Sequence, residues 1–189
     1  YPTHGIGPIA KMLDINKGNR FISLVSMSSK SRGLREYVIN QLGPDHPRMN
    51  TVFNQGDITT TIIKCANGET VLLTHDCSLP RPYSRAQRVQ GTKGLWMEDK
   101  NALHFDDFGD ERWAPMSEYL ESYEHPVWKD FIEGGVKGGH GGMDWLVQRA
   151  FIDAIKTGSQ TSIDVYDSVT WMAITALSEE SISCGSLPQ

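Results

Sequence analysis

The chain has 189 residues, enough for one domain with a hydrophobic core. Its hydrophobic content of 39%, charged content of 22% and net charge of −5 are ordinary for a globular protein. No Lys/Arg cluster appears, which disfavours nucleic acid as a partner, and no apolar run approaches the roughly 18 residues of a membrane helix.

The first part of the chain predicts two helices with a strand between them. The helices span residues 7–13, with Pro8 in the first turn, and residues 31–42, with Ser31 as the cap. Between them, residues 20–28 alternate apolar and polar side chains, as a half-buried strand does.

The middle of the chain predicts strands. Residues 57–66 and 69–77 are β-rich runs joined by Asn67-Gly68, a strong short-range hairpin signal. Three further short strands are expected at residues 85–91, 94–98 and 102–105. We expect these four to six mainly antiparallel strands to form one open-faced sheet.

The last part predicts helices at residues 115–123, 126–132, 143–156 and 164–181, with a glycine-dense loop at residues 134–142. The final helix carries an apolar face, which comprises Val165, Val169, Met172, Ala173 and Ala176. The fold class is therefore α+β, with helices packed on one face of the sheet.

Two phenols and a histidine form the main candidate for acid/base chemistry. Tyr1 and His4 stand three positions apart at the mouth of the first helix, and Tyr83 follows two prolines and Arg81. Such a set suits a polyhydroxylated substrate, with Arg81 or Arg85 as the cation that a basic phenol needs. The alternatives, a surface Tyr beside a helix-capping His and a packing aromatic in a proline turn, stay open.

The glycine-dense loop contains Gly138-Gly139-His140-Gly141-Gly142, which lacks the order of a dinucleotide fingerprint and follows no strand. His140 and Asp144 lie one helical turn apart and could share a ligand site there, and a flexible interhelix loop is the alternative. His75 and Cys77 face the same way on a strand, but two ligands fall short of a zinc site. We therefore predict no metal and a locally hydrogen-bonded His75.

Cysteines and the chain start add two expectations. Cys65 and Cys77 could lie on paired strands, and whether they bond stays open.

The chain starts at Tyr1 rather than Met, and no phosphate-cradling glycine loop precedes the first motif. We therefore expect the back half of an enzyme whose cofactor half is absent, and the localisation stays unknown.

Four blocks occur in an order that resembles one family. They are YPTHGIGP at residues 1–8, RFISLVSMSS at residues 20–29, PRPYSR at residues 80–85 and GHGGMD at residues 139–144. Together they resemble the C-terminal domain of the NAD-dependent α-N-acetylgalactosaminidases of glycoside hydrolase family 109. That family belongs to the glucose–fructose oxidoreductase/inositol dehydrogenase superfamily, and the resemblance covers the chain from end to end.

The resemblance implies that residues 1–189 are one substrate-side domain, which works against a Rossmann domain that binds NAD and is absent here. It implies transient oxidation of the sugar 3-hydroxyl, elimination at C2 and water addition, in place of the two-carboxylate route. By position in the motifs, Tyr1, His4 and Tyr83 match catalytic residues, and we place Arg81, His140 and Asp144 at the substrate. A bacterial, exported setting is suggested by the family alone.

Two other classes remain as alternatives. The chain could belong to a plain NAD(P)-dependent sugar or cyclitol dehydrogenase, for which net NADH formation from free sugar would speak. It could also be a sheet-based module that joins two copies without chemistry. Because the family's nucleotide loop is absent, this chain alone is expected neither to hold NAD tightly nor to turn over.

Overall fold

The computed structural model describes residues 2–189, so the catalytic role expected of Tyr1 lies outside the described residues. The chain divides into two compact units. Unit 1 runs up to Pro82 and resumes at Ile163, and unit 2 spans Tyr83–Ser162. The strands accordingly fall into two sheets, one of three and one of four strands, and the expected single sheet is wrong.

Unit 1 is built on an antiparallel sheet of β1 (Phe21–Ser28), β2 (Ile58–Cys65) and β3 (Thr70–Asp76), in that order. The hairpin predicted at Asn67-Gly68 is confirmed: the Cys65 N–H donates to the Glu69 carbonyl at 2.8 Å. Because side chains alternate along a strand, each face of the sheet carries a row of apolar residues from β1, β2 and β3. Leu24, Ile63 and Val71 form one row, and Val25, Ile62 and Leu72 form the other.

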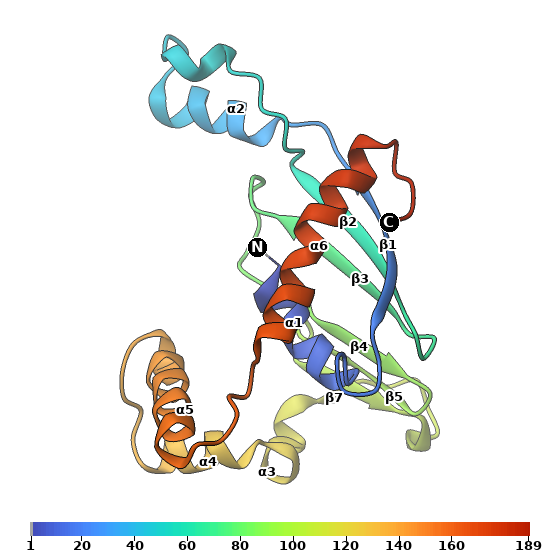
Figure 1. Cartoon of the computed structure of the whole chain (residues 1–189), viewed down its shortest axis with the longest axis vertical. Coiled ribbons are helices and arrows are strands. Elements are labelled where there is room, and N and C mark those ends of the chain that lie inside the picture. Colours follow the sequence, from blue (N-terminus) through green and yellow to red (C-terminus); the bar gives the residue numbers. More distant parts are fainter. Residues whose placement is uncertain (1) are drawn as a thin grey trace. The chain divides into compact units, whose positions relative to one another are not determined.

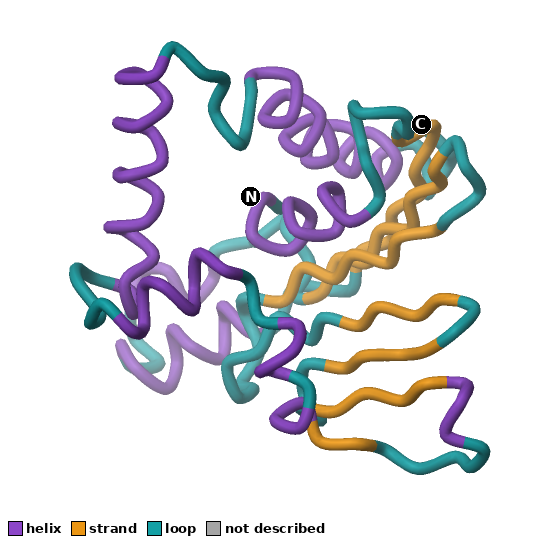
Figure 2. The backbone as a smooth tube through the Cα atoms, turned by 90° about the horizontal axis from the view of Figure 1, so that it is seen from below, coloured by secondary structure: helices purple, strands orange, loops and turns teal. Residues whose placement is uncertain are grey.

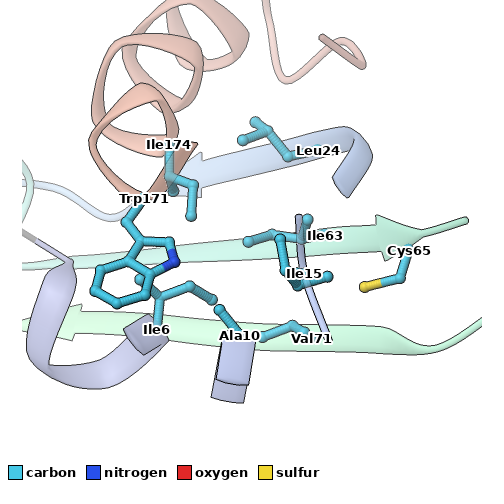
Figure 3. Close-up of a cluster of buried hydrophobic side chains, with 9 residues drawn as sticks. All are labelled: Ile6, Ala10, Ile15, Leu24, Ile63, Cys65, Val71, Trp171 and Ile174. Atoms are coloured by element: carbon cyan, nitrogen blue, oxygen red, sulfur yellow. The ribbon is translucent and has the colours of Figure 1, made fainter. Parts of the chain in front are cut away.

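Helices α1 (Thr3–Met12) and α6 (Val165–Ser183) cover the same face of this sheet (Figures 1 and 2). Figure 3 shows the resulting core, in which Ile6 of α1 and Trp171 and Ile174 of α6 meet Leu24 and Ile63 of the strands. The opposite face of the sheet remains open. The predicted α+β class, with helices on one face of an open antiparallel sheet, is confirmed.

The face of α6 that meets the sheet differs from the prediction. Val165 and Val169 are 67% and 63% exposed, whereas Trp171 and Ile174 are buried. The helix carries apolar residues on more than one side, so apolar spacing did not single out the buried side. Its start is a capping box, in which the Asp164 carboxylate accepts from the Asp167 N–H at 2.9 Å.

Between β1 and β2 the chain forms an excursion, residues 29–57, which we call the arm. It contains α2 (Gly33–Tyr37), a π-helical turn η1 (Val38–Leu42) and a 3₁₀ turn η2 (Pro47–Asn50), and Figure 1 shows α2 beyond the end of the strands. The predicted cap Ser31 is wrong. The Asp57 carboxylate accepts from the N–H groups of Arg32 and Gly33 instead, at 2.7 and 2.9 Å.

Unit 2 carries the second sheet, β4 (Arg88–Gly91), β5 (Gly94–Met97), β6 (Ala102–Phe105) and β7 (Ala114–Pro115), paired in sequence order. Residues 114 and 115 extend this sheet, so the helix expected from residue 115 begins later. The helical elements of the unit are η3 (Asp106–Phe108), η4 (Met116–Glu118), α3 (Leu120–Tyr123), α4 (Pro126–Glu133), η5 (His140–Gly142) and α5 (Met143–Thr157).

The cysteines do not pair. Cys65 ends β2 and is buried, while Cys77 follows β3 and is exposed, so the antiparallel hairpin places the two thiols at opposite ends. Burial raises the pKa of the Cys65 thiol, and the nearby Glu69 carboxylate adds to this. Over residues 2–189, no helix is both long and apolar enough to cross a bilayer.

Candidate functional site

His4 lies in the first turn of α1 and faces away from the core. The helix packs tightly because two glycines keep its inner side flat: a Cβ on Gly7 would lie 3.1 Å from the Trp171 ring, and one on Gly5 would lie 3.3 Å from Leu73. Ile6 between them is fully buried, whereas the His4 side chain is exposed. The glycines of this motif therefore serve packing, and the packing fixes the backbone that presents His4.

Arg81 ties down the turn that leads to Tyr83. Its Nε lies 3.1 Å from Asp76 Oδ2, and its guanidinium also donates to the backbone carbonyls of Asp76 and Pro82 at 3.2 Å. These bonds order the proline turn, and a substrate contact by Arg81 stays a prediction. The Tyr83 side chain is 85% exposed, which leaves the phenol open to solvent.

His75 makes local hydrogen bonds, as the sequence predicted. Its Nε2 lies 3.4 Å from Cys77 Sγ, and its Nδ1 lies 3.4 Å from Gln55 Nε2. Across residues 2–189, His, Cys, Asp and Glu side chains nowhere gather in threes around a possible metal position.

The glycine-dense loop of unit 2 packs against two aromatic rings. A Cβ on Gly142 would lie 2.1 Å from the Phe131 ring, and one on Gly138 would lie 3.1 Å from Trp145 Cβ. Phe131 and Trp145 stack with their ring centroids 5.5 Å apart. Both glycines also have positive φ, at 97° and 83°, which other residues adopt at a cost. Gly138 and Gly142 are therefore positions at which the packing of the loop requires glycine.

This loop presents a carboxylate–imidazole pair. His140 Nδ1 lies 2.8 Å from Asp144 Oδ2, and His140 holds the left-handed conformation, with φ 49°. The hydrogen bond that the His140 imidazole donates to the Asp144 carboxylate, helped by the negative charge of that carboxylate, raises the pKa of His140 above the ordinary 6.5. Because Asp144 fixes Nδ1 and the imidazole is 75% exposed, Nε2 faces solvent and can exchange a proton with a bound ligand.

The glycine-dense loop does not form a dinucleotide cradle. A phosphate-binding glycine loop follows a strand and directs free N–H groups at the ligand, whereas here α4 precedes the loop and aromatic rings fill the space beside Gly138 and Gly142. The residues of this loop therefore do not fit NAD.

One tryptophan lines a hollow of unit 2. Trp113 is 38% exposed and lines a hollow of about 210 Å³ together with Leu95, His104 and Glu111. The sequence left open which indole could stack on a sugar, and this position combines an exposed indole with a carboxylate and an imidazole.

Among the predicted site residues that the structure describes, it brings His140 and Asp144 together. His4 and Arg81 belong to unit 1, while Tyr83 and the His140–Asp144 pair belong to unit 2. The carboxylate that holds Arg81, Asp76, was missed. Its signal in the sequence was an acidic residue at the end of a strand, five positions before an arginine.

The fold places the chain in a broader class. It superposes on an oxidoreductase domain protein from Kribbella flavida with a TM-score of 0.57 and 17% identity, over 96% of this chain and 48% of that one. This chain therefore shares its α+β fold with about half of that protein, and residues 2–189 contain no Rossmann domain.

The sequence then gives the family. All residues, 1–189, match the model of the glycosyl hydrolase 109 C-terminal domain, and the chain belongs to that family. It is 48% identical to an α-N-acetylgalactosaminidase of Tannerella forsythia, over 98% of this chain and 40% of that protein. It is 49% identical to a glycosyl hydrolase family 109 protein of Stenotrophomonas maltophilia, over 97% and 41%. The chain thus spans about two fifths of the length of these curated relatives.

Proposed function

We propose that this chain is the substrate-side part of a longer NAD-dependent glycosidase that cleaves α-N-acetylgalactosaminides. The observation that carries the proposal is the match of the whole chain to the glycosyl hydrolase 109 C-terminal family, with relatives named α-N-acetylgalactosaminidase. The exposed His140–Asp144 pair adds a proton-exchanging group of the kind that such chemistry requires.

The route that we propose separates redox chemistry from proton transfer. NAD, held by a preceding domain, would accept a hydride from C3 of the sugar and later return it. The 3-ketone makes the C2–H acidic, so loss of that proton expels the group at C1. Water then adds at C1, and C2 regains a proton. Paired carboxylates are not needed, which agrees with a set of histidine and tyrosine side chains.

The residues of this chain would handle the protons. His4 and Tyr1 are proposed at the 3-hydroxyl and the C2 proton, and Tyr83 at the reacting ring. His140, oriented by Asp144, would exchange a proton through Nε2 at an oxygen of the sugar. Arg81 would act mainly by fixing the turn before Tyr83, since Asp76 already engages its guanidinium.

We further propose that both units form one substrate-side domain and that the chain alone neither holds NAD nor turns over. Calorimetry on the 189-residue chain tests this directly. Tight NAD binding to the chain would contradict it.

The catalytic assignment is tested in the longer protein with an aryl α-N-acetylgalactosaminide. We expect His4→Ala, Tyr83→Phe and His140→Ala each to lower kcat at least about 100-fold, the scale of losing a general acid or base. Tyr123→Phe is the matched control, because Tyr123 is also an exposed phenol of unit 2 outside the motifs. If all three site variants kept full turnover, the proposed site would be wrong.

A sugar or cyclitol dehydrogenase is the second candidate, because the structural neighbour is named an oxidoreductase domain protein. The reaction products distinguish the glycosidase from the dehydrogenase. Aryl release without net NADH supports the glycosidase, whereas NADH accumulation from free sugars without aryl release supports the dehydrogenase.

The open face of the unit 1 sheet is proposed to bind a second copy of the chain. Val25, Ile62 and Leu72 lie in register across its three strands, and Ile62 and Leu72 are more than half exposed. A face of this kind suits a two-fold contact between identical copies. Ile62→Lys should shift a dimer to monomer in sedimentation, and Val165→Lys on α6 should not. A wild-type monomer at high concentration would contradict the proposal.

A further inference from the structure

The arm is fastened at its base. The Ser29 N–H donates to the Ile58 carbonyl at 2.9 Å, and the Asp57 carboxylate holds the N–H groups where α2 begins. Gly56 lies against the Ser29 carbonyl so closely that a Cβ there would meet it at 2.2 Å. The start and the end of the arm are thus joined, and the space between them is shaped by fixed backbone.

A hollow of about 290 Å³ lies within the arm. Its polar wall comes from Ser31, Arg32 and Arg35 at the start of α2. The facing wall comes from η2 and the segment after it, and includes Met49, Asn50 and Phe53. The volume is close to the lower limit of small-molecule pockets, about 300 Å³.

The charged side chains that line this hollow are both positive. Two of its lining residues are arginines, three positions apart, and no aspartate or glutamate lines it. Within the part of the chain that the structure describes, neither Arg32 nor Arg35 has a carboxylate within 4.0 Å of its guanidinium. Arg35 Nη2 lies instead 3.9 Å from Met49 Sδ, which holds that guanidinium toward the facing wall. Two like charges beside one hollow attract an anion.

A buried hydroxyl at the same place has no partner. Ser31 Oγ is shielded from solvent and makes no hydrogen bond with any described residue. Buried polar atoms without partners are uncommon in folded proteins, and each one calls for an explanation. Because Ser31 also lines the hollow, rotation of its side chain about the Cα–Cβ bond would let the hydroxyl donate to a ligand oxygen there.

We propose that the hollow binds a small organic anion, a compact molecule with a carboxylate, sulfate or phosphate group. Arginine forks match the planar or tetrahedral oxygens of such groups, and the Ser31 hydroxyl and the Asn50 amide can donate further hydrogen bonds. Met49 and Phe53 supply apolar contact for the body of the ligand. The proposal does not depend on the glycosidase assignment, because the arm is separate in sequence from every residue of the proposed catalytic set.

Calorimetry on the 189-residue chain tests the proposal with four probes: inorganic sulfate, a hexose 6-sulfate, a hexuronate and the neutral hexose. We expect the charged probes to bind, the neutral hexose not to bind, and the affinity to fall as salt rises. Sulfate binding as tightly as the sugar sulfate would assign recognition to the oxyanion alone. Tighter binding of a sugar derivative than of sulfate would show that the site also contacts the sugar ring. Both outcomes support the site.

Variants give the decisive comparison. Arg35→Gln and Arg32→Gln should each weaken the sugar sulfate roughly tenfold or more, and Ser31→Ala a few-fold. Arg20→Gln removes the same charge at the far end of β1 and should leave the affinity unchanged. Arg35→Lys keeps the positive charge but lacks the two-pronged guanidinium, so its affinity for the sugar sulfate should lie between those of the wild type and Arg35→Gln. Circular dichroism confirms that each variant folds. Absence of binding by every charged probe, or unchanged affinity in both Arg→Gln variants, would overturn the proposal.

Discussion

The two units hold their chemistry in place by different means. In unit 1, a cluster of nine buried residues between the sheet and its two helices fixes α1, and α1 presents His4. In unit 2, the buried apolar residues are few and mostly small, and the His140 loop depends on stacked aromatic rings and on glycines that leave room for them. Unit 1 should therefore tolerate changes on its surface and fail in its core, whereas unit 2 should be sensitive at its loop.

The largest loss of unfolding free energy is expected from a substitution in the core of unit 1. Trp171→Ala removes a buried indole that contacts α1, and should cost about 3–5 kcal/mol of unfolding free energy. Denaturant unfolding followed by circular dichroism measures it. Trp113→Ala in unit 2, where the indole is partly exposed, is the control and should cost much less. Equal losses from the two variants would contradict the comparison.

The next largest loss of unfolding free energy concerns a partly buried ion pair in unit 1, in which the Lys11 side chain is 33% exposed. Asp167 is 2% exposed, and Lys11 Nζ lies 2.5 Å from its Oδ2. Lys11→Met should cost about 3 kcal/mol at neutral pH, since it leaves a buried carboxylate without its cation. Arg88→Met, at a cation of the second sheet without a carboxylate partner, is the control and should cost little.

The same pair predicts an acid dependence. Burial raises the pKa of Asp167, but hydrogen bonds from Lys11, the Asp164 cap and Asn16, with the Lys11 charge, bring the net pKa below the ordinary 3.8. Because the folded pKa is lowered, this stabilisation is present above pH 3.8 and is lost as pH falls through the folded pKa. The free-energy gap between wild type and Lys11→Met should therefore narrow below pH 3.8. A gap that stays constant to pH 2 would contradict this account of the pair.

In unit 2, one pair of adjacent glycines separates packing from backbone strain. Gly142→Ala introduces a Cβ 2.1 Å from the Phe131 ring, whereas Gly141→Ala, also at positive φ, places its Cβ in open space. Gly141→Ala should cost about 1–2 kcal/mol, the price of the left-handed conformation, and Gly142→Ala should cost more. Thermal unfolding of both variants measures the difference. Equal costs would mean that the rings do not hold the loop.

The smallest expected effect is a change in the pKa of His140. Asp144→Asn removes the charge that raises the pKa of His140, so that pKa should fall toward 6.5. NMR titration of the imidazole protons measures the change, and Asp153→Asn on the same helix should leave it unaltered. Because the folded pKa is raised, the pair stabilises the protein below pH 6.5, and this is lost as pH rises through the folded pKa. An unchanged His140 titration in Asp144→Asn would contradict the pair.

Local patterns in the sequence predicted much of this structure. The Asn67-Gly68 hairpin depends on near neighbours and is confirmed. His140 does contact Asp144, but it lies before α5 in the left-handed conformation, so the two residues do not share a helical turn. Long-range competition explains the errors. Asp57 replaces Ser31 as the cap from 26 positions away, and apolar spacing could not tell which side of α6 meets the sheet. Short strands likewise carry no signal for the sheet that they join.

Part of the site follows from one sequence and part does not. The motif positions identified His4, Tyr83 and His140 as candidates, and the structure adds their backbone supports. The role of Gly142 against Phe131 depends on how the loop folds back on the preceding helix α4, which periodicity does not encode. The hollow of the arm was also missed, although Arg32 and Arg35 are spaced one helical turn apart.

The most direct test of the central claim uses the longer protein, NAD⁺ and an aryl α-N-acetylgalactosaminide in D₂O. The proposed route removes the C2 proton and later replaces it, so the released sugar should carry deuterium at C2. Aryl release with C2 deuteration, lost together in His4→Ala, is the predicted result. Aryl release at full rate with only hydrogen at C2, and no dependence on added NAD⁺, would contradict the oxidation–elimination route and indicate direct hydrolysis.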